Sequence, residues 1–138
     1  MSSELLQKIG IPVFCVVLLG CPMPEQRAAE IQFPLRVTSI GIRNETGRLI
    51  QQTRIRSGSF GETCGVIGSE ATAELHYSTL ARRPKLAPQV SIEWTSEDGV
   101  PHQAEVDLQK LAGVELHRDG SVLFCINSAG KLTVETEK

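Results

Sequence analysis

Cysteine is the most reactive residue type in this chain, and it occurs four times, at Cys15, Cys21, Cys64 and Cys125. A thiol can ligate a metal, form a disulfide or accept a covalent lipid, and its surroundings decide which of these happens. A structural zinc site needs about four ligands. Cys64 and Cys125 lie far apart in the sequence with no histidine close to either, so the sequence predicts no metal site.

The N-terminal segment reads as a secretory signal. Residues 9–19, IGIPVFCVVLL, contain no charge, while Lys8 precedes them and the small residue Gly20 follows. A positive region, a short apolar region and a small residue at the cut are typical of signal peptides. The run is too short to span a bilayer, which needs about 17–25 apolar residues. The sequence therefore predicts a signal peptide over residues 1–20.

The end of this apolar run resembles the lipobox of bacterial lipoproteins. The motif is Leu18-Leu19-Gly20-Cys21. The resemblance implies cleavage between Gly20 and Cys21, attachment of a diacylglycerol to the Cys21 thiol and acylation of its new amine. One acyl chain binds a membrane marginally, whereas two or more hold a protein stably. The resemblance thus implies a protein anchored by lipid to a bacterial membrane and facing the periplasm.

A tether is expected directly after the proposed lipid site. Residues 22–34, PMPEQRAAEIQFP, contain three prolines and mixed polar residues. Thirteen flexible residues span on the order of 20 Å root-mean-square. We therefore expect residues 21–34 to form a lipidated cysteine with a flexible tether, and residues 35–138 to form the folded domain.

The lipobox interpretation leaves two cysteines in the mature chain, Cys64 and Cys125. An even pair in an oxidising compartment suggests a disulfide. Closing a loop of about 60 residues would stabilise the fold by roughly 4 kcal/mol in the chain-entropy model. The alternative is that both are small buried side chains that never meet. We expect a Cys64–Cys125 disulfide, with that alternative open.

No other residue pattern points to catalysis or to a cofactor. His76, His102 and His117 are isolated in the sequence, with no HxH or HExxH spacing between them. Asp98 and Asp119 each precede a glycine, so turn chemistry accounts for them. No GxSxG elbow or phosphate-binding glycine loop occurs. We therefore expect no catalytic residues and no enzyme activity, and a hydrolase is the least favoured hypothesis.

The densest local charge is the cluster Arg82, Arg83 and Lys85, within the segment LARRPKLAP at residues 80–88. A solvated loop explains it, but loops held on a β scaffold often carry binding. The chain as a whole has 14 basic and 16 acidic residues, a net charge of −2, with few aromatics. That composition disfavours nucleic-acid binding. The three cations remain a possible binding loop.

The rest of the chain predicts an all-β fold. Short runs rich in Val, Ile and Thr are interrupted by turn residues every 8 to 12 positions. About seven to eight such strands favour an antiparallel β-sandwich, immunoglobulin-like or transthyretin-like, and a small β-barrel is the alternative. Trp94, Phe124 and Tyr77 are the expected large core residues.

These observations predict where the protein is located rather than what it does. We expect a membrane-anchored envelope lipoprotein whose sandwich is a protein-interaction or structural module with an envelope partner. The alternative is a small-ligand-binding envelope protein. Beyond Cys21 no single residue decides between them.

Overall fold

Alternation of buried and exposed side chains explains why most of the chain forms strands. In strand β9, Gln89–Ser96, the side chains of Val90, Ile92 and Trp94 are buried, whereas the residues between them are more exposed. This period of two is the pattern of a sheet with one face on a core. Strand β11, Ser121–Ile126, repeats the pattern with Val122 and Phe124.

The computed structural model describes residues 31–138. The predicted signal peptide, the cleavage site at Gly20 and the lipid site at Cys21 lie outside the described residues. Residues 32–138 form one compact unit. Its remaining strands are β3 Leu35–Arg36, β4 Ser39–Asn44, β5 Ile50–Ser57, β6 Phe60–Ile67, β7 Thr72–His76, β8 Lys85–Leu86, β10 Pro101–Asp107 and β12 Leu132–Glu137.

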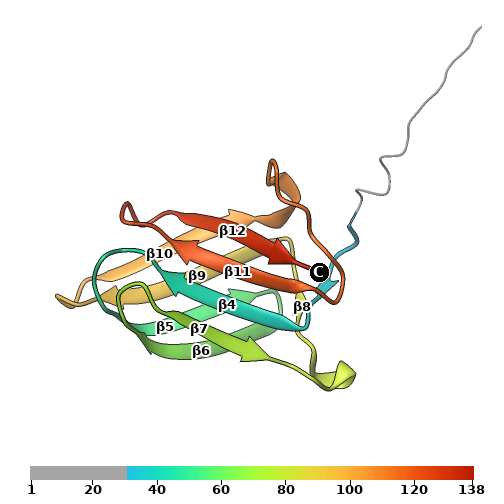
Figure 1. Cartoon of the computed structure of the whole chain (residues 1–138), viewed down its shortest axis with the longest axis horizontal. Coiled ribbons are helices and arrows are strands. Elements are labelled where there is room, and N and C mark those ends of the chain that lie inside the picture. The colour runs from blue at the N-terminus through green and yellow to red at the C-terminus, as the bar shows by residue number, and fades with distance from the viewer. Residues whose placement is uncertain (1–30) are drawn as a thin grey trace, which may run out of the picture. The chain divides into compact units, whose positions relative to one another are not determined.

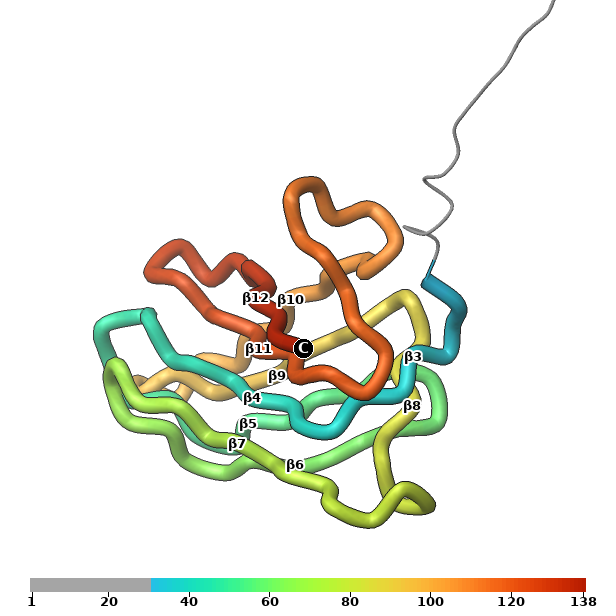
Figure 2. The backbone as a smooth tube through the Cα atoms, turned by 45° about the vertical axis from the view of Figure 1, so that its right-hand side comes forward, coloured from blue at the N-terminus to red at the C-terminus, as the bar shows by residue number. Residues whose placement is uncertain are grey.

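The strands form a β-sandwich. One sheet has the order β10-β9-β5-β6, and the other has the order β12-β11-β4-β7. The two sheets lie face to face (Figure 1), and the short pair β3–β8 lies at one end (Figure 2). All pairs are antiparallel except β4 with β11, which are parallel. The predicted all-β sandwich is therefore confirmed, and the barrel alternative is wrong.

The order of the strands separates the two predicted sandwich types. In an immunoglobulin domain the first and second strands pair in one sheet. Here β4 pairs with β11 and β7, whereas β5 belongs to the opposite sheet. This topology is not immunoglobulin-like and leaves the transthyretin-like alternative.

The core lies between the two sheets. Phe124 is fully buried and Trp94 is 4% exposed, as predicted for large core residues. Tyr77 is only half-buried, because it follows the edge strand β7, where its ring meets that of Phe60 at a centroid distance of 6.5 Å. The expectation for Tyr77 was thus only partly right, since an edge strand has a neighbour on one side alone.

Two segments predicted without strands contain short regular structure. Residues 80–88 include a 3₁₀ helix, η2 at Leu80–Arg82, followed by β8. The segment after β10 contains the 3₁₀ helix η3, Leu108–Lys110, in which the Asp107 carboxylate accepts a hydrogen bond from the Gln109 amide. Among the described residues no helix has the length and apolarity needed to cross a bilayer.

Candidate functional site

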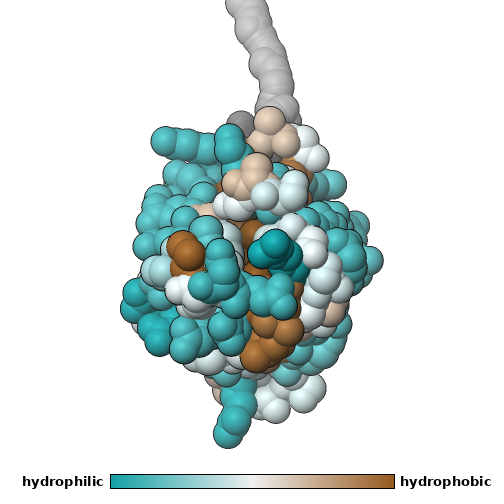
Figure 3. Space-filling view, turned by 90° about the vertical axis from the view of Figure 1, so that its left-hand side faces the viewer, coloured by the Kyte–Doolittle hydropathy of each residue, from teal (hydrophilic) through white to brown (hydrophobic). Residues whose placement is uncertain are grey.

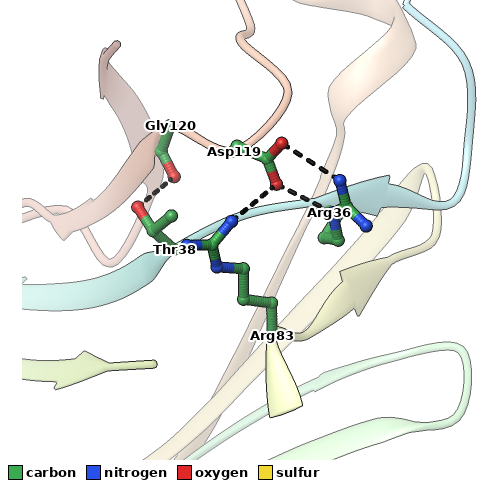
Figure 4. A network of polar contacts seen from close by, with 5 residues as sticks. All are labelled: Arg36, Thr38, Arg83, Asp119 and Gly120. Carbon is green, nitrogen blue, oxygen red and sulfur yellow. Dashed lines mark hydrogen bonds and ion pairs between the residues drawn. The ribbon is translucent and has the colours of Figure 1, made fainter. Parts of the chain in front are cut away.

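A shared carboxylate joins three distant segments at one end of the sandwich. Asp119 accepts hydrogen bonds from Arg36 Nε at 2.8 Å, from Arg36 Nη2 at 3.1 Å and from Arg83 Nη1 at 3.3 Å (Figure 4). Arg36 comes from β3, and Arg83 comes from the connection between β7 and β8. We call these three residues the arginine clamp.

Backbone contacts hold the carboxylate in place. The Asp119 amide donates to the Arg36 carbonyl at 2.6 Å, and Thr38 donates to the Gly120 carbonyl through both its amide and its hydroxyl. Asp119 has a positive φ of 61°, which Asp tolerates better than most residues. A Cβ at Gly120 would collide with the carbonyl oxygen of Glu137. The requirements of a turn therefore explain why Asp and Gly occur at 119 and 120, but they do not explain why Asp119 binds two arginines.

The clamp changes the titration of its own members. The hydrogen bond from the Arg36 guanidinium, reinforced by its charge and by Arg83, lowers the pKa of Asp119. The same bond raises the pKa of Arg36. The pair is therefore ionised at neutral pH, and Asp119 is not poised as a proton donor or acceptor.

The three cations of the predicted binding loop have different surroundings. Arg83 is not a free cation, because its side chain is 23% exposed and pairs with Asp119. The sequence alone could not place the distant Asp119 beside Arg83. Arg82 and Lys85 are exposed, and neither forms an ion pair with another described residue. These two side chains are available to a partner.

The predicted disulfide is not formed. Cys64 and Cys125 are both free, and they lie on β6 and β11, in opposite sheets. Cys125 alternates with the core residue Phe124, so its side chain points to the outer face, where Sγ lies 3.8 Å from Glu135 Oε2. The thiol of Cys125 thus points away from the sheet that carries Cys64. The even number of cysteines suggested a disulfide, but the face of the sheet on which each thiol lies depends on strand register, and here it keeps the two thiols apart.

Neither thiol has the surroundings of a nucleophile. Burial first, and then the charge of a neighbouring glutamate, raise the pKa of both Cys64 and Cys125. Reactive cysteines need the opposite shift, because the thiolate is the attacking species. The raised pKa of each thiol therefore disfavours the thiolate form at neutral pH.

The three histidines lie on different parts of the surface. His76 Nε2 lies 3.1 Å from Glu74 Oε1, but the two side chains are 71% and 54% exposed. His117 lies 4.0 Å from Glu115, and His102 stacks on Trp94. A hydrolase would need a histidine and its partner in a cleft, and the exposed His76–Glu74 pair does not meet that condition. Within residues 31–138 no group of three potential metal ligands occurs.

A small hollow lies at the other end of the sandwich, among the turns that join β4 to β5, β9 to β10 and β11 to β12. It has a volume of about 240 Å³ and is lined by Leu49, Trp94, His102 and Ala129, among others. The His102 ring stacks on the Trp94 indole at 5.4 Å. Figure 3 faces this end and shows apolar surface gathered between hydrophilic residues. A hollow of this size admits a small ligand or one side chain of a partner.

A second hollow, of about 670 Å³, lies on the outer face of the sheet β10-β9-β5-β6. It is lined mainly by polar residues that include Gln52, Arg54 and Glu93. Ligand pockets are mostly apolar with few polar groups, so this open and polar surface is a weaker candidate.

Comparison with known proteins adds no function. No protein-family description matches the chain, and no curated protein sequence matches it. One similar solved structure is the NMR structure of a protein from Eubacterium rectale, with 15% sequence identity and a TM-score of 0.43. The similarity covers 70% of this chain and 84% of that one.

Proposed function

We propose that this protein is a lipid-anchored envelope lipoprotein whose β-sandwich is an interaction module. The observation that carries the proposal is the motif Leu18-Leu19-Gly20-Cys21 at the end of an uncharged run. A lipobox is effective only where a signal region delivers it, and residues 9–19 have the composition of such a region. In this proposal residues 22–34 are the tether that precedes strand β3.

An interaction role is favoured over catalysis by the character of the described surface. The histidines are dispersed, both thiols have raised pKa values, and Asp119 is neutralised by the arginine clamp. Exposed cations and exposed apolar side chains are what remain for recognition. Such groups bind partners without needing a catalytic constellation.

The anchor is tested by metabolic labelling in a bacterial host. Cells expressing the full chain are grown with a labelled fatty acid, and the protein is isolated and checked for label. Wild type should carry label, and Cys21→Ser should carry none and accumulate as uncut precursor. Cys15→Ser and Cys64→Ser are matched controls that should be labelled like wild type. Absence of label on the wild-type protein would refute the proposal.

The interaction role has its own test. The lipidated protein is extracted from membranes under mild conditions, after chemical cross-linking, and its mass is measured. A defined complex with another envelope protein is expected. Recovery of the uncomplexed chain alone would contradict an interaction role while leaving the anchor intact.

A second candidate function, binding of a small ligand, is favoured by the hollow beside Trp94. Trp94 is the single tryptophan of the chain and lines both hollows, so its fluorescence reports on a ligand in either of them. A ligand should quench or shift this fluorescence and raise the melting temperature, and His102→Ala should weaken both effects. Quenching that persists unchanged in His102→Ala would place the ligand elsewhere.

A further inference from the structure

The helix η2 exposes a large apolar side chain next to cations. Leu80 is 55% exposed, and none of the residues of η2 is buried. Arg82 ends the helix and Lys85 begins β8 shortly after it. Figures 1 and 2 both show this segment at the end of the sandwich where the described chain begins. The pairing of an exposed leucine with cations needs an explanation that the arginine clamp does not supply.

Several cations lie at the same end. Arg36 and Lys85 are partners in the β3–β8 pair, and directly opposed residues present their side chains on the same face. Arg83 reaches Asp119, whose exposed neighbour is Arg118. Together these cations are Arg36, Arg82, Arg83, Lys85 and Arg118, and we call them, with Leu80, the basic surface.

Neutralisation within the basic surface is incomplete. Asp119 is shared by Arg36 and Arg83, whereas Arg82, Lys85 and Arg118 form no ion pair with another described residue. Two exposed acids, Glu115 and Glu137, lie at the same end, because the Glu115 carbonyl accepts from Thr136 and Glu137 pairs with Ser121. The three unpaired cations are therefore the local positive charge that a partner can meet.

The described chain begins beside these cations. Arg36 is the second residue of β3, the first described strand, and Val37 donates to the carbonyl of Pro84 at 3.2 Å. If Cys21 is lipidated, a flexible tether of residues 22–34 would place β3 at a root-mean-square distance on the order of 20 Å from the lipidated residue. The segment that carries Arg82 and Lys85 is hydrogen-bonded to the chain just beyond this tether. The following inference rests on the proposed lipid anchor for its biological setting.

We propose that the basic surface docks onto the anionic headgroups of the membrane, with Leu80 inserted at the interface. The charges attract the surface to anionic lipid, and the apolar side chain gains from burial at the headgroup boundary. A soluble polyanion such as nucleic acid would satisfy the charges but would leave Leu80 in water. The combination of charge and exposed leucine thus favours a lipid surface over a soluble polyanion. The opposite end, with the turns β4–β5, β9–β10 and β11–β12, is called the hairpin end. Docking would hold it away from the membrane.

Vesicle binding tests the proposal without the lipid anchor. The chain from Pro22 to Lys138 keeps every described strand and the whole described core, which lies between Leu35 and Val134. It is sedimented with vesicles of phosphatidylcholine alone or mixed with phosphatidylglycerol. Binding to the mixed vesicles is expected, with half-saturation on the order of 1 mM lipid at low salt and loss at high salt. Equal sedimentation with both kinds of vesicle would overturn the proposal.

Matched variants separate the basic surface from general charge. R82E/K85E/R118E should weaken binding to mixed vesicles by about 100-fold or more, since each cation contributes near the surface. R48E/R54E/K131E makes the same change in net charge at exposed positions elsewhere, and should weaken binding by about threefold or less. Circular dichroism checks that both variants fold. Equal weakening in the two variants would refute a localised surface.

Leu80 distinguishes a membrane from a soluble polyanion. Leu80→Ala should weaken binding to mixed vesicles by about fivefold, whereas Val100→Ala, at a residue 47% exposed in the β9–β10 turn, should not. A short DNA duplex is the competing probe, and it should bind far more weakly than the vesicles. Tight binding to DNA with no effect of Leu80→Ala would overturn the proposal. If labelling of Cys21 fails but vesicle binding is seen, the anchor is wrong and the surface stands.

Discussion

The two ends of the sandwich are held together by different kinds of contact. At the arginine end, Arg36 and Asp119 are 83 residues apart in sequence, and their ion pair joins segments that share no turn. At the hairpin end, three turns each use a side chain of their own, from Asn44, Ser96 and Asn127. Trp94 packs beneath these turns at 4% exposure. Ion pairs between segments distant in sequence hold the arginine end, whereas polar contacts within turns and apolar packing hold the hairpin end.

This difference implies a difference in sensitivity. Ion pairs at partly exposed sites are weakened by salt and by loss of ionisation. Buried amide hydrogen bonds and aromatic packing are insensitive to both. The hairpin end should therefore contribute most of the stability, whereas the arginine end should respond most to solution conditions.

The largest effect is expected at Trp94. Trp94→Ala removes a nearly buried indole and leaves a cavity, which should lower the free energy of unfolding by about 3–5 kcal/mol. Urea unfolding followed by circular dichroism measures it. His102→Ala removes only the exposed ring that stacks on the indole and should cost about 1 kcal/mol. A Trp94→Ala variant as stable as His102→Ala would show that the hairpin end does not depend on apolar packing.

Asn44 should give the next largest effect. Its fully buried amide donates to the carbonyls of Ile67 and Gly68, at 3.0 and 3.1 Å, and accepts from Thr46. Asn44→Ala leaves these groups unpaired and should lower the free energy of unfolding by about 2–3 kcal/mol. Asn127→Ala is the matched control in an exposed turn and should cost about 1 kcal/mol or less. Equal losses would contradict the role of burial.

A smaller effect, dependent on salt, is expected at Asp119. Asp119→Asn keeps a side chain that tolerates the positive φ but removes the charge shared by two arginines. The variant should be less stable than wild type at low salt, by less than the Asn44→Ala variant, and the difference should shrink as salt is added. Thermal unfolding over a series of salt concentrations measures it. A difference that is constant in salt would show that the clamp acts through geometry alone.

The same residue gives a pH dependence with a defined sign. Because the pKa of Asp119 is lowered by the hydrogen bond and charge of Arg36, its contribution is present above the unfolded value of about 3.9 and is lost as pH falls through the lower folded pKa. Asp119→Asn should therefore lose less stability than wild type between neutral pH and that acid range. Asp98 is the comparison at the hairpin end, since the hydroxyl of Ser96 is the main cause of its lowered pKa. Asp98→Asn should also reduce the loss of stability at acid pH, and this effect should depend little on salt.

No effect at all is expected from reduction. Because Cys64 and Cys125 are free in opposite sheets, a reducing agent should leave the melting temperature unchanged. Under native conditions a thiol reagent should modify half-buried Cys64 before Cys125, which is 1% exposed, and in denaturant it should modify both without prior reduction. Protection of both thiols in unreduced, denatured protein would show that a disulfide exists.

The sequence predicted the parts of this structure that depend on local alternation. The burial of Trp94 and Phe124 and the sandwich class were predicted from short apolar runs and turn residues. It could not predict contacts that depend on how distant strands align. The Asp119 partnership with Arg36 and Arg83, and the separation of Cys64 from Cys125, both follow from the pairing of β4 with β11 and from strand parity. No local pattern carries that information.

The parallel pair β4–β11 has a consequence for how the chain is made. Ser39 aligns with Ser121, so the central strand β4 lacks one of its two neighbours until the chain has been synthesised past Ile126. A nascent chain that ends before β11 exposes an unpaired strand edge that can pair with other chains. Completion of this fold thus waits for β11, the last but one of its strands, to be translated. Premature termination would yield an aggregation-prone product rather than a smaller stable domain.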